Sequence, residues 1–355
     1  MAPIRVLIVD DSAFMRKSLS IILGSDPEVE IVGTARDGLE GFELTKKLTP
    51  DLVTLDIEMP KMDGLTALKK IMAECPTTVI MVSSLTTEGA ESTLKALELG
   101  AVDFIPKEMS FVSVNIVGIK DELLKKIKYF GRKKSIRATL NRIQILRQTR
   151  VQTPVVPIST LTDMPKIGYK AVAIGISTGG PLSLQKVIPR LAGNIGVPVF
   201  IVQHMPPKFT KSLADRLNSM SQLNVKEAEN NEEVKSNNVY IAPGGFHMTA
   251  VKNGSTVKIS INSEPSTTLH RPSVDVMVQS LVGIYGKNLM GIIMTGMGRD
   301  GLLGIQDLKK LGGYALAQDE ESCVVYGMPK AVVDAGCADV VAPLEKISDI
   351  INKAL

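Results

Sequence analysis

The chain has 355 residues, too many for one typical hydrophobic core, so its length predicts two domains. Apolar residues make up 44% of it and charged residues 22%, no apolar run reaches the roughly 18 residues of a membrane span, and the three cysteines form no Cys-x-x-Cys pair. This composition excludes a membrane-spanning protein, a disulfide framework and a zinc knuckle, and it predicts a cytoplasmic protein without direct membrane insertion.

Residues 1–125 alternate short apolar runs with stretches in which apolar residues recur at helical spacing. Five repeats of strand and helix predict an α/β fold with a doubly wound parallel sheet. Because the carboxyl ends of parallel strands meet at one edge of a sheet, we expect the side chains that follow them to line one crevice. The predicted strands are 4–9, 30–32, 52–55, 79–82 and 102–105.

Five polar side chains lie at or directly after the ends of these strands: Asp10, Asp11, Asp56, Ser83 and Lys107. Three carboxylates in one place repel one another unless a cation lies among them, and hard oxygen ligands with open positions suit Mg²⁺. A carboxylate beside the metal can attack a phosphoryl group and become an aspartyl phosphate. Helix capping explains a single aspartate at a strand end, but it does not explain the whole set.

Four motifs mark residues 3–125: VLIVDDSAFMRKSL, PDLVTLDIEMPKMDGLTAL, TTVIMVSSLT and LGAVDFIPK. Together they resemble the receiver domain of two-component response regulators. The resemblance implies a flavodoxin-like fold in which Asp56 is the phosphoacceptor. It also implies that Asp10 and Asp11, together with Asp56, hold Mg²⁺.

The same resemblance assigns two further residues of the receiver. Lys107 pairs with the phosphoryl group, and Ser83 is the hydroxyl that responds to it, with the adjacent Ser84 as the alternative for this switch role. The switch aromatic of many receivers corresponds to Phe104 or to one of its neighbours, and we leave that choice open.

Residues 126–165 are predicted to form a linker, since prolines and Ser/Thr residues gather toward its end. The net charge of +4 hides a basic segment here, because residues 120–150 contain eleven Lys or Arg and only Asp121 and Glu122 as acids. No aromatic interleaving or helix-turn-helix pattern accompanies this charge. We therefore interpret the segment as a solvated basic helix and linker, and not as a surface that binds nucleic acid.

Strand and helix alternation resumes in residues 166–355 and predicts a second parallel-sheet domain, Rossmann-like in its class. Its clearest strands end in polar or glycine-rich corners that carry Ser177, His204 and Asp300. The strand-end rule places these three residues in one crevice. The strands in question are predicted at 170–174, 197–203 and 289–294.

A serine, a histidine and an aspartate in one crevice can activate a hydroxyl. Histidine accepts the serine proton near neutral pH, and the carboxylate fixes the imidazole tautomer. Ser177 lies in AIGISTGG, where Gly-x-Ser-x-Gly is typical of a nucleophile on a sharp turn from strand to helix. Backbone N–H groups from Thr178 onward are then expected to face a developing oxyanion.

Several assignments in this half have alternatives. His204 is preferred as the base because it follows a strand, whereas His247 and His270 are expected to line the cleft without being the base. Asp275 is the alternative to Asp300 as the orienting carboxylate. The chain order Ser, His, Asp differs from that of the α/β-hydrolases, so the motif does not assign this domain to that fold.

Five further motifs extend over residues 168–352: AIGISTGGP, PVFIVQHMPPKFT, VYIAPGGFHM, LHRPSVDVM and IIMTGMGRDG. They resemble the catalytic domain of the chemotaxis protein-glutamate methylesterases, and the receiver in front of them extends that resemblance along the whole chain. The implied site residues are the triad Ser177, His204 and Asp300 and the oxyanion residues Thr178 and Met297.

This resemblance also implies a function and its partners. The expected activity is a phosphorylation-activated serine hydrolase that removes methyl groups from glutamate γ-methyl esters of methyl-accepting chemotaxis receptors and deamidates selected receptor glutamines. A chemotaxis histidine kinase is the expected phosphodonor, and a receptor methyltransferase opposes the enzyme. We expect Mg²⁺ for receiver phosphorylation, no cofactor for ester hydrolysis, and a monomeric protein.

Two other classes of protein contain receivers. A transcription factor needs a compact helix-turn-helix or winged domain, and residues 166–355 show parallel-sheet signals instead. A catalytically idle adaptor has no need of a nucleophile, a base and an orienting acid. The sequence therefore favours the enzyme over both.

Overall fold

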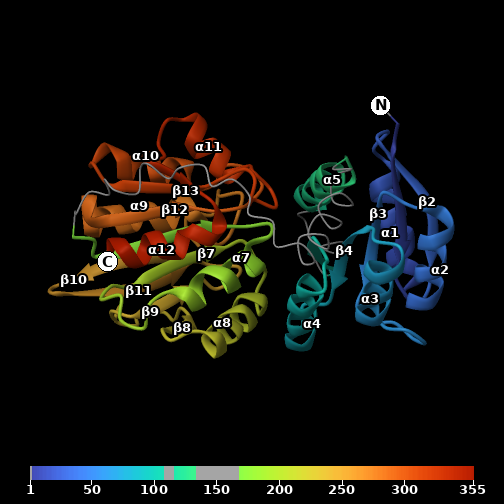
Figure 1. Cartoon of the computed structure of the whole chain (residues 1–355), viewed down its shortest axis with the longest axis horizontal. Helices are drawn as coiled ribbons and strands as arrows, with labels where there is room; N and C mark the ends of the chain where they lie inside the picture. The colour runs from blue at the N-terminus through green and yellow to red at the C-terminus, as the bar shows by residue number, and fades with distance from the viewer. Residues whose placement is uncertain (1, 108–115, 133–167) are drawn as a thin grey trace, which may run out of the picture. The chain divides into compact units, whose positions relative to one another are not determined.

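The computed structural model describes residues 2–107, 116–132 and 168–355. The chain divides into two compact units, Met1–Val156 and Pro157–Leu355, and each has its own sheet (Figure 1). Within the described ranges, no helix is long and apolar enough to cross a membrane.

The first unit is built on a five-stranded parallel sheet in the order β2-β1-β3-β4-β5. The strands β3 and β4 are buried along their whole length, which explains why their sequences are continuous apolar runs and do not alternate. This sheet confirms the predicted flavodoxin-like fold. Its strands are β1 (Ile4–Val9), β2 (Val29–Ala35), β3 (Leu52–Asp56), β4 (Thr78–Ser83) and β5 (Asp103–Pro106).

The first four helices of this unit begin at short polar residues. Ser12, Asp37, Asp63 and Thr86 each accept a hydrogen bond from the backbone N–H three residues further on, which satisfies one of the free donors of the first turn. Three of these helices, α1, α2 and α4, start within a few residues of a strand end and so fix the loops at that edge. The helices are α1 (Ala13–Gly24), α2 (Gly38–Leu48), α3 (Gly64–Glu74), α4 (Thr87–Glu98) and α5 (Ile116–Arg132).

The helix α5 extends the first unit past the boundary expected at residue 125. Phe130 is buried, and a Cβ added to Gly131 would lie 2.3 Å from the side chain of Ile4, so the end of α5 packs closely on β1. Arg132 also pairs with Glu28. The first residues of the expected linker therefore belong to a packed helix, and the remainder, 133–165, lies outside the described residues.

The second unit is built on a seven-stranded parallel sheet in the order β14-β13-β12-β6-β7-β9-β8. The strand β6 lies between β7 and β12, with Ile176 opposite Gln203 and Gly175 opposite Ile293. The ends of these three strands are therefore neighbours, as the sequence predicted. The strands are β6 (Ala171–Ile176), β7 (Val199–Gln203), β8 (Asn224–Glu227), β9 (Asn238–Ile241), β12 (Leu289–Ile293), β13 (Tyr314–Gln318) and β14 (Val340–Ala342).

An antiparallel hairpin that the sequence analysis does not predict lies outside this sheet, formed by β10 (His247–Asn253) and β11 (Thr256–Asn262). The helix α9 packs against β10, β6 and α10. A Cβ on Gly175 would lie 2.4 Å from Val274, so the start of α9 lies directly against β6. The helices are α7 (Gly180–Val187), α8 (Phe209–Met220), α9 (Val274–Tyr285), α10 (Leu302–Lys310), α11 (Met328–Asp334) and α12 (Leu344–Ala354), with short 3₁₀ turns at Ile188–Arg190 and Gly286–Asn288.

Candidate functional site

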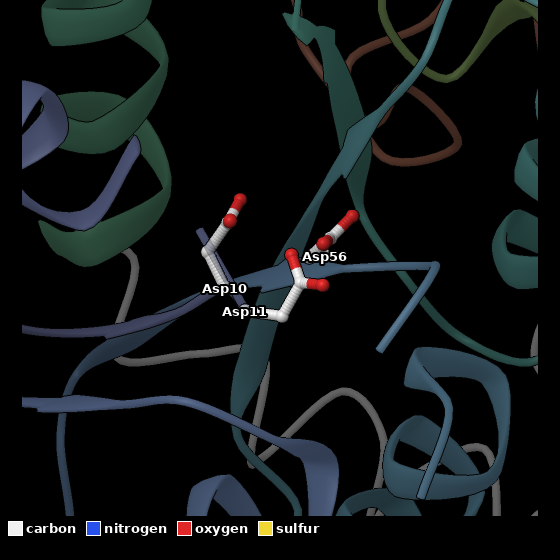
Figure 2. Close-up of side chains that lie close together, drawn as sticks. All are labelled: Asp10, Asp11 and Asp56. Carbon is white, nitrogen blue, oxygen red and sulfur yellow. The ribbon is translucent and has the colours of Figure 1, made fainter. Parts of the chain in front are cut away.

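In the first unit, three carboxylates gather at the ends of β1 and β3. Asp10 and Asp11 follow β1, and Asp56 is the last residue of β3 (Figure 2). One carboxylate oxygen from each residue lies within 4.8 Å of the other two. Asp10 and Asp56 are buried and Asp11 is exposed, so the cluster is open on one side. The structure brings together the three residues that the sequence placed there.

Lys107 supplies positive charge to this cluster. Its Nζ lies 2.7 Å from Asp56 Oδ2 and 3.5 Å from Asp10 Oδ2. Burial raises the pKa of Asp56 to about 6 and the charge of Asp10 adds to this effect, although Lys107 opposes both. Burial likewise raises the pKa of Asp10. One lysine therefore does not compensate fully for the buried carboxylates, which favours a further cation at this place.

Ser83 and Ser84 have different surroundings at the end of β4. Ser83 is fully buried, and its Oγ donates to the carbonyl oxygens of Gly89 at 3.2 Å and Ser84 at 3.3 Å. Ser84 Oγ lies 3.5 Å from Glu58 Oε1, and the N–H of Glu58 donates to Asp56 at 3.4 Å. Ser84 Oγ also lies 3.2 Å from Thr86 Oγ1, and within the described ranges neither serine hydroxyl is bonded to Asp56, so the switch role of Ser83, with Ser84 as its alternative, stays a prediction.

In the second unit, Ser177 is the first residue after β6 and is half-buried. Its N–H donates to the carbonyl of Thr295 at 2.9 Å, and its own carbonyl accepts from the N–H of Gly180 at 2.8 Å. These bonds fix the backbone of Ser177 on both sides. Among the described residues its hydroxyl has no hydrogen-bond partner, so that oxygen is left available for a reaction.

Ile176 at the end of β6 is paired with Gln203 at the end of β7. Ser177 directly follows Ile176 and His204 directly follows Gln203, so these two residues lie beside each other. The His204 N–H donates to the carbonyl of Ile176 at 3.1 Å, which continues the pairing of β6 and β7 by one step. Its Nε2 lies 2.8 Å from Asp300 Oδ2, and its Nδ1 is buried with no partner in the described part of the chain. The ring is thus held at one nitrogen and free at the other.

Asp300 follows β12 and is held by the start of α9. Its Oδ1 accepts from the Ser273 hydroxyl at 2.9 Å and the Asp275 N–H at 3.0 Å, and its Oδ2 accepts from the Val274 N–H at 2.7 Å as well as from His204. Burial opposes the ionisation of this carboxyl, but the bond to His204 and the backbone N–H donors hold its pKa well below the usual range. Asp300 is therefore a carboxylate that fixes the proton of His204 on Nε2.

Comparison with known proteins agrees with this geometry. The family model of the CheB methylesterases matches residues 172–351, and that of the response regulator receiver domain matches residues 6–115. A protein-glutamate methylesterase/protein-glutamine glutaminase of Pyrococcus abyssi is 47% identical over 354 residues, which cover 99% of this chain and 94% of the relative. The chain belongs to the CheB methylesterase family.

Further members of the CheB methylesterase family are similar over comparable lengths. A protein-glutamate methylesterase/protein-glutamine glutaminase of Lawsonia intracellularis is 46% identical over 359 residues, which cover 99% of each chain. The crystal structure of the CheB methylesterase catalytic domain of Thermotoga maritima matches with a TM-score of 0.52 and 46% identity, and the match covers 53% of this chain and 100% of that one. This likeness confirms the fold of the second unit.

The two oxyanion residues expected for a CheB methylesterase lie beside Ser177. A Cβ on Gly296 would lie 2.8 Å from the Cβ of Ser177, so the loop that carries Met297 passes directly against the serine. Within the described ranges the N–H of Met297 makes no hydrogen bond. Thr178 is buried, and its carbonyl accepts from the Thr295 hydroxyl at 3.0 Å.

The other two histidines of this CheB-family chain have different surroundings. His247 is fully buried, its Nδ1 accepts from the Ser273 N–H at 3.2 Å, and burial lowers its pKa, so it is a neutral residue that supports the loop before α9. The His270 ring stacks on the His204 ring with centroids 4.2 Å apart. His204 is the histidine that the structure pairs with Asp300.

The alternative carboxylate, Asp275, occupies a different position. Its Oδ1 accepts from the N–H of Gly304 at 2.8 Å, and burial together with the charge of Asp300 raises its pKa to about 6. Of the two carboxylates, Asp300 is the one that is bonded to His204. The sequence analysis assigns no role to Ser273, although a serine cap and the free backbone N–H groups of the first helical turn together form a set of donors for a carboxylate.

A cavity of about 590 Å³ is lined in part by Asp300, the hydrogen-bond partner of His204. Its wall includes His270, Ser273 and Asp275, and it is mostly apolar elsewhere. Leu269 and Leu303 line it as well and are themselves exposed. The carboxylate end of the site therefore adjoins an apolar surface.

We expect Gly179→Ala to destabilise the second unit more than Gly196→Ala, a substitution at a glycine with nearly the same backbone conformation. Gly179 has φ +78°, and a Cβ there would lie 2.5 Å from Val324, whereas Gly196 has φ +76° and no atom near its Cβ position. The left-handed backbone costs an alanine about 1–2 kcal/mol at either site, and overpacking adds about 1–3 kcal/mol at Gly179 alone. Urea unfolding of both variants measures the difference, and equal losses would contradict the close packing.

Proposed function

We propose that Ser177 is the nucleophile of this protein-glutamate methylesterase, that His204 is its general base, and that Asp300 orients His204. The observation that carries the proposal is the 2.8 Å hydrogen bond between His204 Nε2 and Asp300 Oδ2. His204 follows β7, which is paired with β6, the strand that Ser177 follows. Because this bond occupies Nε2, the buried and unpartnered Nδ1 is the nitrogen that takes the serine proton.

The family membership supplies the reaction. The chain is a protein-glutamate methylesterase and protein-glutamine glutaminase with a receiver domain, regulated by phosphorylation in chemotactic adaptation. We assign its substrate bonds as glutamate γ-methyl esters and selected glutamine side-chain amides of receptors. The sequence analysis reached the same activity from motifs along the whole chain.

The proposed steps balance with the three side chains and water. Ser177 Oγ attacks the ester carbonyl carbon while His204 Nδ1 takes the hydroxyl proton. The imidazolium then gives this proton to the methoxy oxygen, and methanol leaves an acyl-enzyme. Water attacks the acyl-enzyme with His204 again as base, which releases the glutamate side chain and restores the serine. For an amide substrate, ammonia leaves in place of methanol.

The oxyanion of each tetrahedral intermediate needs backbone donors. The N–H of Ser177 already donates to Thr295, so it is not one of them. We assign the N–H groups of Met297 and Thr178 to this task, because the loop of Met297 lies against Ser177 and Thr178 directly follows it. The scheme assigns no metal ion or other cofactor to ester hydrolysis.

In the receiver, we propose that Asp56 accepts the phosphoryl group and that Asp10, Asp11 and Asp56 hold Mg²⁺. The donor set fits this ion, because it offers hard carboxylate oxygens within 4.8 Å of one another. Asp10 Oδ2 is buried and its contact with Lys107 Nζ is long, at 3.5 Å, which makes this oxygen a candidate ligand. The ion, when bound, neutralises charge on the phosphoryl oxygens, and Lys107 is placed to pair with them.

We expect Asp56→Asn to abolish activation by a small-molecule phosphodonor such as acetyl phosphate. The amide removes the attacking carboxylate and leaves the second unit unchanged. Methanol release from methylated receptor membranes, measured with and without the phosphodonor, checks this. Asp63→Asn is the control, because Asp63 is an exposed cap of α3 and asparagine caps equally well. An Asp56→Asn protein that still responds would contradict the assignment.

The family also indicates the class of partner, namely a receptor as substrate and a kinase as phosphodonor. The opposing receptor methyltransferase, the monomeric state, the cytoplasmic location and the lack of nucleic-acid binding stay predictions from the sequence.

A further inference from the structure

Gln203 is a buried amide at the end of β7, directly before His204. Only 2% of it is exposed, in a strand whose other residues are apolar. Sequence reasoning gave it no role. A polar side chain in such a place requires an explanation, because its groups must be paired inside the protein.

The amide group of Gln203 connects the two strands that carry the nucleophile and the base. Its Nε2 lies 3.0 Å from the carbonyl oxygen of Ser177 and 3.2 Å from that of His204. Both partners are acceptors, so the side chain must present its NH₂ group to them and not its oxygen. The two N–H bonds of one amide thus hold the carbonyls of the nucleophile and of the base.

The amide oxygen of Gln203 is in an environment that does not favour the folded state. Gln203 Oε1 is buried without a hydrogen-bond partner in the described residues, and a Cβ on Gly180 would lie 1.9 Å from it. A buried acceptor without a donor is unfavourable, and an apolar side chain of similar length would avoid it. The residue therefore fits a role in the site better than a role in the core.

We propose that Gln203 is a positioning residue that fixes the Ser177 and His204 backbones relative to each other, an inference that rests on the proposed function. The carbonyl of His204 has no other hydrogen bond in the described part of the chain, and that of Ser177 has one other donor, the N–H of Gly180. Without Gln203 the two strands keep the bond from the His204 N–H to the Ile176 carbonyl, but the carbonyls of Ser177 and His204 lose the donor that they share. Proton transfer from Ser177 to His204 requires the alignment that this shared donor supports.

The first test is Gln203→Met, with Gln185→Met as the matched control on α7. Gln185 has a side-chain amide nitrogen without a partner among the described residues, so its loss breaks no such connection. For Gln203→Met we expect kcat for methyl-ester hydrolysis to fall about 100-fold with KM unchanged, since misalignment slows the step and not binding. Sulfonylation of Ser177 by phenylmethylsulfonyl fluoride is expected to slow in parallel, because it uses the same base-assisted attack.

A second variant, Gln203→Glu, separates positioning from folding. The carboxylate faces two carbonyl oxygens and cannot donate, whereas the protonated acid donates once. The activity relative to the parent enzyme is therefore expected to rise as the pH is lowered from about 8 to about 6, since burial raises the pKa of a carboxyl. Taking the ratio to the parent removes the pH effects that both enzymes share. Thermal unfolding of both variants verifies that the compared proteins are folded.

Parent-like kcat and sulfonylation in folded Gln203→Met would overturn the proposal. A rise in KM alone, a slower turnover with unchanged sulfonylation, or a pH-independent ratio for Gln203→Glu would overturn it as well. Failure of the underlying function is separately visible, because the parent enzyme would then be neither sulfonylated at Ser177 nor inhibited by the reagent.

Discussion

Replacing Ser177 with alanine is expected to reduce methanol release from methylated receptors by roughly 10⁴-fold or more. On the proposed mechanism, the variant lacks the oxygen that forms the acyl-enzyme. It should keep its fold, because the hydroxyl of Ser177 has no hydrogen-bond partner among the described residues. The free energy of unfolding should change by roughly 1 kcal/mol or less. Methanol release and urea unfolding, measured on the same preparation, check both expectations.

Ser183→Ala is the control for this experiment. Ser183 lies on α7 in the segment that follows the nucleophile, and its hydroxyl donates to the carbonyl of Gly179 at 2.9 Å. Its loss affects the helix and leaves the nucleophile in place, so activity should remain. A folded Ser177→Ala protein that releases methanol at the parent rate would show that the nucleophile is another residue. Comparing His204→Ala with His270→Ala tests the base in the same way.

Asp300→Asn is expected to lower kcat by about 10³- to 10⁴-fold. The carboxylate accepts from four donors, and an amide cannot accept from all of them. With its NH₂ toward His204 it donates to Nε2, which forces the ring proton onto Nδ1 and prevents acceptance from Ser177. If the NH₂ group of the asparagine instead points toward Asp275, it faces the Asp275 backbone N–H, and two donors then face each other. Either orientation therefore disturbs the base or its support.

The loss of activity in Asp300→Asn should exceed its loss of stability. An unmade buried hydrogen bond costs about 1–3 kcal/mol, whereas a 10⁴-fold loss of rate corresponds to about 5 kcal/mol in the barrier. Single-turnover rates and urea unfolding separate the two quantities. Asp275→Asn serves as the comparison, because Asp275 is not bonded to His204. A parent-like rate in Asp300→Asn with a slow Asp275→Asn would transfer the orienting role to Asp275.

Much of both sites could be predicted because parallel strands end at a common edge. The runs predicted at 52–55 and 289–294 correspond to β3 and β12 within one residue at either end, since buried parallel strands are continuous apolar runs. The run predicted at 30–32 became the longer β2, Val29–Ala35, because only part of that strand is buried and its apolar pattern is weaker. Strand ends fixed the position of Ser177 and Asp56 without any contact being known.

Contacts between distant segments could not be predicted in this way. The donors of Ser273 to Asp300 and the amide of Gln203 depend on how α9 and β7 pack, which no local pattern contains. The hairpin of β10 and β11 is a different case. Its turn contains Gly254 at φ +59° between apolar stretches, a hairpin signal that was present in the sequence.

The order of strands in the second unit has a consequence for its synthesis. Ser177 and His204 end neighbouring strands that follow each other in the chain, but His204 and Asp300 are 96 residues apart. A chain that is still emerging from the ribosome can therefore align its serine and histidine long before the aspartate exists. We therefore expect a chain that ends before β12 to lack the carboxylate that holds His204 and, on the proposed mechanism, to have little esterase activity.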